Sequence, residues 1–364
     1  MQRSHITVWQ GISLTAMFIL GSPAVMGAAN EAGADSCLGV VIGLLLAVPA
    51  VLVYARIKRL RPGEDMYGAL IWAFGRVVGK VLAALITWYA LHLGALTLHS
   101  FTEFIGATAL PQTPQAVTAL MVGAVAVWAV KSGQNTLGRW STVFFLAVAC
   151  TLAATLVLAI PYYDAGNLLP AAYGGAAPLL AGGTTAFATF AEVVVLLFAL
   201  SSFKEGASPY SALIGGVAAG GLALFLLSLR DTLILGGETL GKRYYPSYTA
   251  VRVISLGDFF QRFEIIVGGV FLLCGLLKAA VCLMAAARGI ARLFDIKGHK
   301  KIAAPTGLLM TVLSVMLFKS PMEMLDWMGI YKYYAFSFQV LIPLAVWIAA
   351  EVRSRRGSAG DAGA

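Results

Sequence analysis

The stretch GGTTAFATFAEVVVLLFALSSF, residues Gly182 to Phe203, decides how this chain folds. It is long and apolar enough to cross a bilayer, because about 20 apolar residues span a hydrocarbon core of roughly 30 Å. Glu192 nevertheless stands near its middle, and two glycines stand at its start. A charge at the bilayer centre costs on the order of 3 kcal/mol or more, so it normally faces a polar cavity or a partner. We therefore expect a broken helix that contributes to a solute site.

The composition places the rest of the chain in a membrane as well. Of 364 residues, 59% are hydrophobic and 12% are charged, whereas charged residues make up about a quarter of a typical soluble domain. Nearly uncharged runs recur along the chain, which predicts an all-α polytopic membrane protein. Ten spans are predicted, at about 6–28, 36–57, 81–104, 115–130, 142–161, 182–203, 209–229, 263–287, 305–318 and 334–352. They form a single transmembrane domain over residues 1–352, and residues 353–364 are expected to be a disordered cytoplasmic tail.

The net charge of +9 does not indicate nucleic-acid binding, because the basic residues fall in loops between apolar spans. Most of them lie in the connections that are cytoplasmic if both termini are cytoplasmic, which is the orientation we predict. The four cysteines lack metal-ligand spacing, and no metal or cofactor is expected. Sequence motifs of intramembrane or serine hydrolases and of zinc proteases are missing from the sequence, so we expect no enzyme activity.

Two of the predicted spans are interrupted, and they lie five spans apart. Span 1 is interrupted at Gly21-Ser22-Pro23, and span 6 around Gly182-Gly183 and the polar group Thr184, Thr185, Thr189 and Glu192. Proline and glycine leave backbone groups that need partners inside a membrane. Interruptions at corresponding positions of two halves indicate an inverted-repeat transporter site. We expect repeat one at about 6–161 and repeat two at about 182–352.

The chain resembles the spore germination permease family, the B subunits of GerA-type germinant receptors, within the amino acid/polyamine/organocation superfamily. The matching residues run through most of the chain in a consistent order. They are Gln10, Pro23, Thr102-Glu103-Phe104, Leu110 to Pro114, Gly133 with Arg139, Asn167 to Pro170, Pro178 to Leu180, Thr189 to Glu192, Ser255 to Phe259 with Arg262 and Glu264, and Lys278.

This resemblance implies a LeuT-type fold of ten helices in a 5+5 inverted repeat, with helices 1 and 6 broken and the site between spans 1, 3, 6 and 8. It also implies a receptor subunit in the inner membrane of a spore, which senses a small germinant, usually an amino acid, alongside A and C subunits. The chain departs from such permeases in span 1. It carries Thr15-Ala16-Met17-Phe18-Ile19-Leu20 where they usually have glycines, so we expect a narrower pocket or a different ligand.

The candidate ligand-binding residues come from the two interrupted spans. They are Thr15, Ala16, Met17, Phe18, Gly21, Thr189, Phe190 and Glu192. Glu192 either faces an ammonium or a proton, or it partners a donor on another helix. Lys278 lies deep in span 8 and has two readings. It either replaces the cation that sodium-coupled relatives hold between spans 1 and 8, or it forms a salt bridge to Glu192 or Glu103.

Two functions follow from these observations. The first is a germinant-receptor subunit that binds a small germinant and signals by a conformational shift, with or without ion release. The second is a proton-coupled amino-acid transporter in which Glu192 is the proton site. Neither predicts a partner beyond the small molecule, the lipid bilayer and, for the receptor, the A and C subunits.

Overall fold

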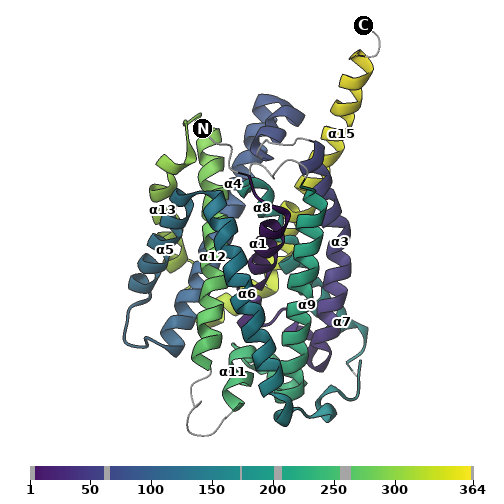
Figure 1. The fold of residues 1–364 in the computed structure, drawn as a ribbon, viewed down its shortest axis with the longest axis vertical. Coiled ribbons are helices and arrows are strands. Elements are labelled where there is room, and N and C mark those ends of the chain that lie inside the picture. The colour runs from purple at the N-terminus through teal and green to yellow at the C-terminus, as the bar shows by residue number, and fades with distance from the viewer. Residues whose placement is uncertain (1–4, 61–65, 173, 201–206, 255–263, 362–364) are drawn as a thin grey trace.

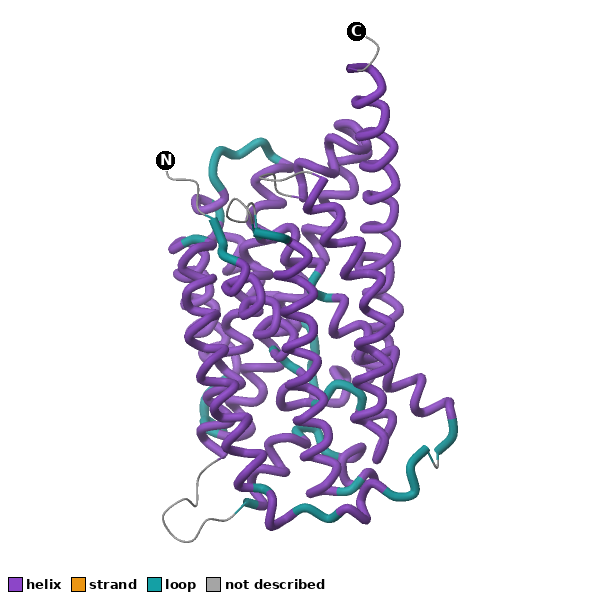
Figure 2. The backbone as a smooth tube through the Cα atoms, turned by 45° about the vertical axis from the view of Figure 1, so that its right-hand side comes forward, coloured by secondary structure: helices purple, strands orange, loops and turns teal. Residues whose placement is uncertain are grey.

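The computed structural model describes residues 5–60, 66–172, 174–200, 207–254 and 264–361, with the backbone alone at 356–361. In this part of the chain nearly every residue is helical, and the helices run along the long axis of one bundle (Figures 1 and 2). Both ends of the chain lie at the same end of the bundle, as an even number of spans requires (Figure 1).

The helices follow the predicted spans closely. Their bounds are α1 Val8–Leu20, α2 Pro23–Met26, α3 Ser36–Leu60, α4 Met66–Thr108, α5 Gln115–Ser132, α6 Gln134–Leu158, α7 Ala176–Ala191, α8 Val194–Ala199, α9 Pro209–Leu235, α10 Gly237–Lys242, α11 Pro246–Val253, α12 Glu264–Leu293, α13 Ala303–Met316, α14 Pro321–Phe336 and α15 Ile342–Asp361. Short 3₁₀ turns lie at Asn30–Asp35, Ile160–Tyr162, Ala165–Leu168 and His299–Lys301, and a π-helical turn at Ser337–Leu341 joins α14 to α15.

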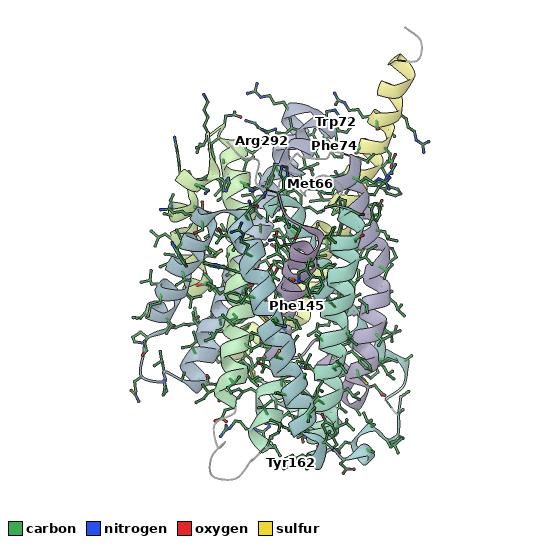
Figure 3. The ribbon with its side chains drawn as sticks, in the orientation of Figure 1. Met66, Trp72, Phe74, Phe145, Tyr162 and Arg292 are labelled. Atoms are coloured by element: carbon green, nitrogen blue, oxygen red, sulfur yellow. The ribbon has the colours of Figure 1, made fainter. Side chains whose placement is uncertain are left out.

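Eight helical stretches of the described chain are long and apolar enough to cross a membrane, and the two shorter apolar helices α1 and α13 fall on predicted spans 1 and 9. The protein is therefore an integral membrane protein, while the count of ten crossings stays a prediction. Large apolar side chains are exposed on many helices, as a lipid-facing surface requires. Figure 3 shows Tyr162 near one end of the bundle and Trp72 near the other, where aromatic residues favour the two membrane interfaces.

The first break lies where the sequence predicts it. Helix α1 begins with a capping box between Thr7 and Gln10 and ends at Leu20. Helix α2 then begins with Pro23, whose missing N–H is no loss at the first position of a helix. The Gly21-Ser22-Pro23 interruption is thus confirmed.

The second break lies at the C-terminal end of the predicted region, at Glu192. Helix α7 runs without interruption through Gly182 and Gly183, and the chain leaves the helix at Glu192 and Val193. The two glycines instead allow close helix packing, because a Cβ atom on Gly183 would lie 2.7 Å from Ile42. Small residues at such contacts are the usual way for membrane helices to approach closely.

Two further boundaries differ from the prediction. Only Gly133, with a positive φ, separates α5 from α6, where a polar loop was expected over 131–139. The last span begins at Pro321 and not near Tyr334, because Ser320 caps α14 by accepting a hydrogen bond from the backbone N–H of Glu323. Helix α15 continues to Asp361, past residue 353, where the disordered tail was predicted to begin. Disorder of this segment stays a prediction.

Candidate functional site

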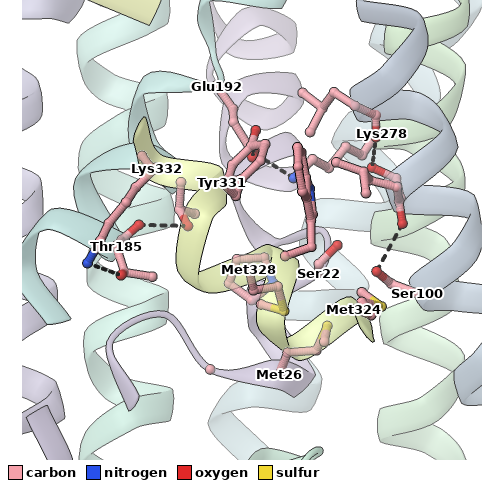
Figure 4. A pocket seen from close by; sticks show the side chains of 18 residues that line it. Ser22, Met26, Ser100, Thr185, Glu192, Lys278, Met324, Met328, Tyr331 and Lys332 are labelled. Carbon is pink, nitrogen blue, oxygen red and sulfur yellow. Dashed lines mark hydrogen bonds and ion pairs between the residues drawn. The ribbon is translucent and has the colours of Figure 1, made fainter. Parts of the chain in front are cut away.

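A cavity of about 100 Å³ lies between the two broken helices, far above the ~10–15 Å³ that one water needs. Figure 4 shows the side chains that surround it. Its lining residues come from α2 and its flanks, α4, α7 and its end, α12 and α14: Ser22, Pro23, Met26, Gly27, Leu93, Leu96, Thr97, Ser100, Thr185, Ala188, Thr189, Glu192, Lys278, Met324, Trp327, Met328, Tyr331 and Lys332. These are the predicted spans 1, 3, 6 and 8, with the first half of span 10 added.

A buried ion pair closes one side of this cavity. Lys278 Nζ lies 2.5 Å from Glu192 Oε2, and the two side chains are 3% and 6% exposed (Figure 4). Glu192 occupies the end of α7, where the chain breaks, and Lys278 lies in the middle of α12. The charge in span 6 therefore has its partner inside the protein, as a charge at this depth requires.

The same lysine also contacts the first broken helix. Its Nζ lies 5.4 Å from the centroid of the Phe18 ring, and its Cδ would lie 2.5 Å from a Cβ atom on Gly21. Only glycine leaves room for the lysine stem at this position. Lys278 thus joins both broken helices to α12, and its salt-bridge partner is Glu192, one of the two carboxylates that the sequence offered. That it replaces a cation between spans 1 and 8 stays a prediction.

Glu192 begins a chain of buried hydrogen bonds toward α4 and the π-helical turn. Tyr331 donates to Glu192 Oε1 at 2.6 Å, and its hydroxyl lies 3.1 Å from that of Tyr89. Gln339, in the π-helical turn, donates to the hydroxyl of Tyr89 at 2.9 Å and to the carbonyl of Ala188 at 2.8 Å. These hydrogen bonds connect the end of α7, α14, α4 and the π-helical turn, and they begin at the carboxylate of Glu192.

The backbone carbonyls freed by the second break are satisfied by side chains from distant segments. The single hydroxyl hydrogen of Tyr54 on α3 is shared between the carbonyl of Gln339, which is the shorter contact, and the carbonyl of Ala191 at 3.3 Å, while Gln339 donates to the carbonyl of Ala188. At the other end of α8, Lys58 donates to the carbonyl of Leu200 at 2.7 Å. A buried carbonyl without a partner costs about 1–3 kcal/mol, so these contacts stabilise the broken helix.

The predicted site residues separate into two groups. Thr189, Glu192 and Lys278 line the cavity, and Gly21 contacts Lys278 beside it. The others are buried in helix packing and are not lining residues: Thr15, Ala16, Met17, Phe18 and Phe190. Thr15 packs against Gly216 of α9, and Met17 lies 3.9 Å from the sulfur of Cys274. The motif residues Ser255 to Phe259 and Arg262 lie outside the described residues.

Glu103 is not brought to the ion pair. Its carboxylate accepts a hydrogen bond of 2.7 Å from Tyr244, which precedes α11, and the same hydroxyl lies 3.1 Å from the sulfur of Met324. Burial and the hydrogen bond to Glu103 raise the pKa of Tyr244, so the phenol stays a neutral donor. Glu103 therefore fixes the connection before α11 to the end of α4.

The sequence interpretation did not include the contribution of α14. Tyr331, Lys332, Met324, Met328 and Trp327 all line the cavity, and the buried indole N–H of Trp327 has no hydrogen-bond partner among the described residues. The signal that could have revealed this helix is Ser320-Pro321 with Glu323, a typical helix start.

Comparison with solved structures identifies the fold. The chain superimposes on Mhp1, a nucleobase-cation-symport-1 family transporter in a closed conformation with bromovinylhydantoin bound, with a TM-score of 0.68 and 15% identity over 98% of this chain and 82% of that one. It also matches a Na⁺-coupled sialic acid symporter in an outward-open state, with a TM-score of 0.66 and 9% identity over 97% and 90%. MhsT in complex with L-phenylalanine gives 0.56 and 15% over 93% and 97%. The predicted LeuT-type fold with broken helices 1 and 6 is thus confirmed.

Comparison of sequences identifies the family. Two proteins of Bacillus subtilis strain 168 are each 23% identical to this chain. Putative spore germination protein YfkT aligns over 94% of this chain and 95% of its own, and spore germination protein KB over 98% and 97%. The family pattern described as spore germination protein matches residues 5–322. The chain therefore belongs to the spore germination permease family.

Proposed function

We propose that the chain is the membrane subunit of a spore germinant receptor, which binds a small amino acid in the central cavity and signals to A and C subunits by a conformational shift. Its place would be the inner membrane of the spore, with both termini cytoplasmic. The observation that carries the proposal is the buried Lys278–Glu192 pair, because it joins the two broken helices beside a cavity that a small solute can fill.

The charges of the cavity wall support a ligand with a carboxylate. Two cations, Lys278 and Lys332, and one anion, Glu192, are its charged lining residues, which leaves one positive charge in excess. An amino acid adds a carboxylate for a lysine and for the free N–H of Trp327, and an ammonium that can share Glu192. Charge-assisted hydrogen bonds of this kind are about twice as strong as neutral ones.

The cation beside the cavity is the ammonium of Lys278, which is part of the protein. This supports a receptor and not a sodium symporter. A coupling cation must be free to leave with its solute, whereas Lys278 stays with α12. Ligand binding would then act by changing the geometry of the ion pair, and the shift can be no larger than the ligand's difference in affinity for the two conformations.

A proton-coupled transporter is the second candidate, and one observation favours it. Glu192, Tyr331, Tyr89 and Gln339 form a continuous chain of hydrogen bonds that begins at a buried carboxylate on the cavity. A carboxylate that is alternately charged and neutral, next to such a chain, is what proton coupling needs.

The decisive experiment combines binding, flux and germination. Purified protein would be screened by isothermal titration calorimetry against the common amino acids, and the ligand found would be offered to proteoliposomes with and without a pH gradient. A receptor gives binding without flux, and Glu192→Gln abolishes both binding and germination in a spore assay. Glu238→Gln, an exposed carboxylate in α10, is the control that should change neither. Gradient-driven uptake that Glu192→Gln abolishes would identify the transporter, and no binding of any amino acid would overturn both proposals.

A further inference from the structure

A second hollow, of about 510 Å³, lies on the outside of the bundle between α3, α7, α14 and the π-helical turn. Its lining is almost entirely apolar and includes Pro49, Ala50, Phe187, Phe336 and Leu344. Phe336 and Leu344 are 44% and 39% exposed, at the middle of a helix stretch that is long enough to cross the membrane. This groove therefore faces the hydrocarbon of the bilayer and not water.

One residue lines both the groove and the central cavity. Lys332 of α14 belongs to both linings, while its neighbours divide: Tyr331 lines the cavity and Tyr333 the groove. The facing helix α7 divides in the same way, with Thr185 and Ala188 toward the cavity and Thr184 and Phe187 toward the groove. The Lys332 side chain thus lies at the seam between the two hollows.

The contacts that hold Lys332 in this seam are weak. Its Nζ lies 3.3 Å from Thr184 Oγ1 and 3.5 Å from both Thr185 Oγ1 and the Ala181 carbonyl, near the limit for a hydrogen bond. Figure 4 shows Lys332 beside Thr185. No ion pair of Lys332 occurs among the described residues. Lys332 is linked to a carboxylate only indirectly: the hydroxyl of Thr185, which it contacts, donates to Glu31 at 2.7 Å.

We propose that the central cavity has a lateral entrance from the bilayer, which lies between α7 and α14 and is closed by the side chain of Lys332. The molecules that would use it are small apolar solutes dissolved in the membrane that carry a hydrogen-bond acceptor, such as an ester or an uncharged carboxylic acid. The groove accepts the apolar part, and the lysine, a flexible cation without an acidic partner, attracts the acceptor. The entrance is independent of the identity of the germinant.

Thiol labelling tests this path without knowledge of the ligand. The four native cysteines, Cys37, Cys150, Cys274 and Cys282, would be replaced, and Ser100→Cys would place one thiol on the cavity wall. In proteoliposomes, N-cyclohexylmaleimide serves as the membrane-dissolved reagent and a charged methanethiosulfonate as the aqueous one. We expect Ala50→Trp, which fills the groove, to slow the maleimide at least tenfold, and Lys332→Ala to speed it severalfold. The rate of the charged reagent should stay unchanged in Ala50→Trp, which alters no charge of the cavity wall.

Two controls separate this path from general loosening of the bundle. Ala124→Trp makes the same substitution at an exposed position of α5, away from the groove, and should leave both rates unchanged. If Ala50→Trp does not fold, Leu344→Trp fills the same groove from α15. An unchanged maleimide rate in a folded groove-filling variant, or equal changes for both reagents, would overturn the lateral entrance.

Discussion

Breaking the Lys278–Glu192 pair from one side should cost far more stability than removing it whole. The N–O distance is 2.5 Å and both side chains are almost fully buried, so neither charge can be rescued by water. Removing one partner of such a pair typically costs 3–5 kcal/mol, because the other charge is left uncompensated. We therefore expect Lys278→Met and Glu192→Gln each to lower the free energy of unfolding by about 3–5 kcal/mol.

The double variant should recover most of this loss. With both charges gone, the site contains a methionine beside Phe18 and an amide that still accepts a hydrogen bond from Tyr331. Neutral replacement of a buried ion pair is often close to neutral for stability. We expect the double variant to lie within about 2 kcal/mol of the wild type, which gives a coupling energy of about 3 kcal/mol or more in the double-mutant cycle.

Reversible unfolding in mixed micelles, titrated with denaturing detergent, measures all four proteins under one condition. The exposed pair Lys242–Glu238 on α10 supplies the control, since its side chains are 71% and 86% exposed and Lys242→Met should leave the midpoint unchanged. A double variant as unstable as the sum of the single variants, with a coupling energy below about 0.5 kcal/mol, would refute the ion pair as the link between the broken helices.

Three further predictions concern the surroundings of this pair and one charge outside the membrane. Gly21→Ala should displace the Lys278 stem, lower stability by about 1–3 kcal/mol and weaken ligand binding in calorimetry, whereas Gly106→Ala, with open space around it, should do neither. Tyr331→Phe should lower the free energy of unfolding by about 1–3 kcal/mol, because Glu192 loses a buried donor; an unchanged value would mean that water replaces the hydroxyl. The hydrogen bond and charge of Lys80 lower the pKa of Asp295, just beyond α12, so this pair stabilises the fold above the unfolded-state pKa of about 3.9 and the effect is lost as the pH falls through the lower folded-state pKa. The gap between the thermal midpoints of wild type and Lys80→Met should therefore narrow below about pH 4, to the part that comes from the hydrogen bond of Lys80 to the Leu293 carbonyl, and a gap that widens there would contradict this assignment.

The membrane spans and the first break could be predicted because local chemistry decides them. An apolar run long enough to cross the bilayer has few alternatives to a helix. Gly21-Ser22-Pro23 interrupts such a run through its own backbone chemistry. Lys278 could be assigned a partner for the same reason, since a lysine at that depth needs one.

The exact position of the second break within the predicted region from Gly182 to Glu192 could not be fixed from the sequence, because no glycine or proline stands where the helix ends. Glu192 and Val193 stand in a run of apolar residues without glycine or proline. The donors that satisfy the freed carbonyls come from α3 and the π-helical turn, more than one hundred residues away. The helix is therefore broken by tertiary partners, and the nearby Gly182-Gly183 pair, which looks like a break, serves packing against α3.

Helix α14 was missed because its charges hide it. Glu323, Asp326 and Lys332 lower the hydropathy of its first turns, and the apolar window moves toward α15. Of these three residues only Lys332 lines the cavity, beside Tyr331, so part of this polar pattern marks the helix face that borders the cavity. Low hydropathy at the edge of a predicted span is thus a signal for a cavity as well as for a loop.

The contacts of α14 also indicate which part of the bundle can respond to a ligand. The ion pair joins α1, α7 and α12 through buried charges, whereas α14 is held by the hydroxyl of Tyr331, the weak contacts of Lys332 and the thioether of Met324. The π-helical turn that follows α14 is a geometry often found at functional sites. A solute that fills the cavity competes with the weaker set first, so we expect α14 to move against a fixed core of α1, α7 and α12. Spin labels on α14 and α12 would measure this: a distance that changes on ligand addition supports it, and movement of α12 against α7 would exclude it.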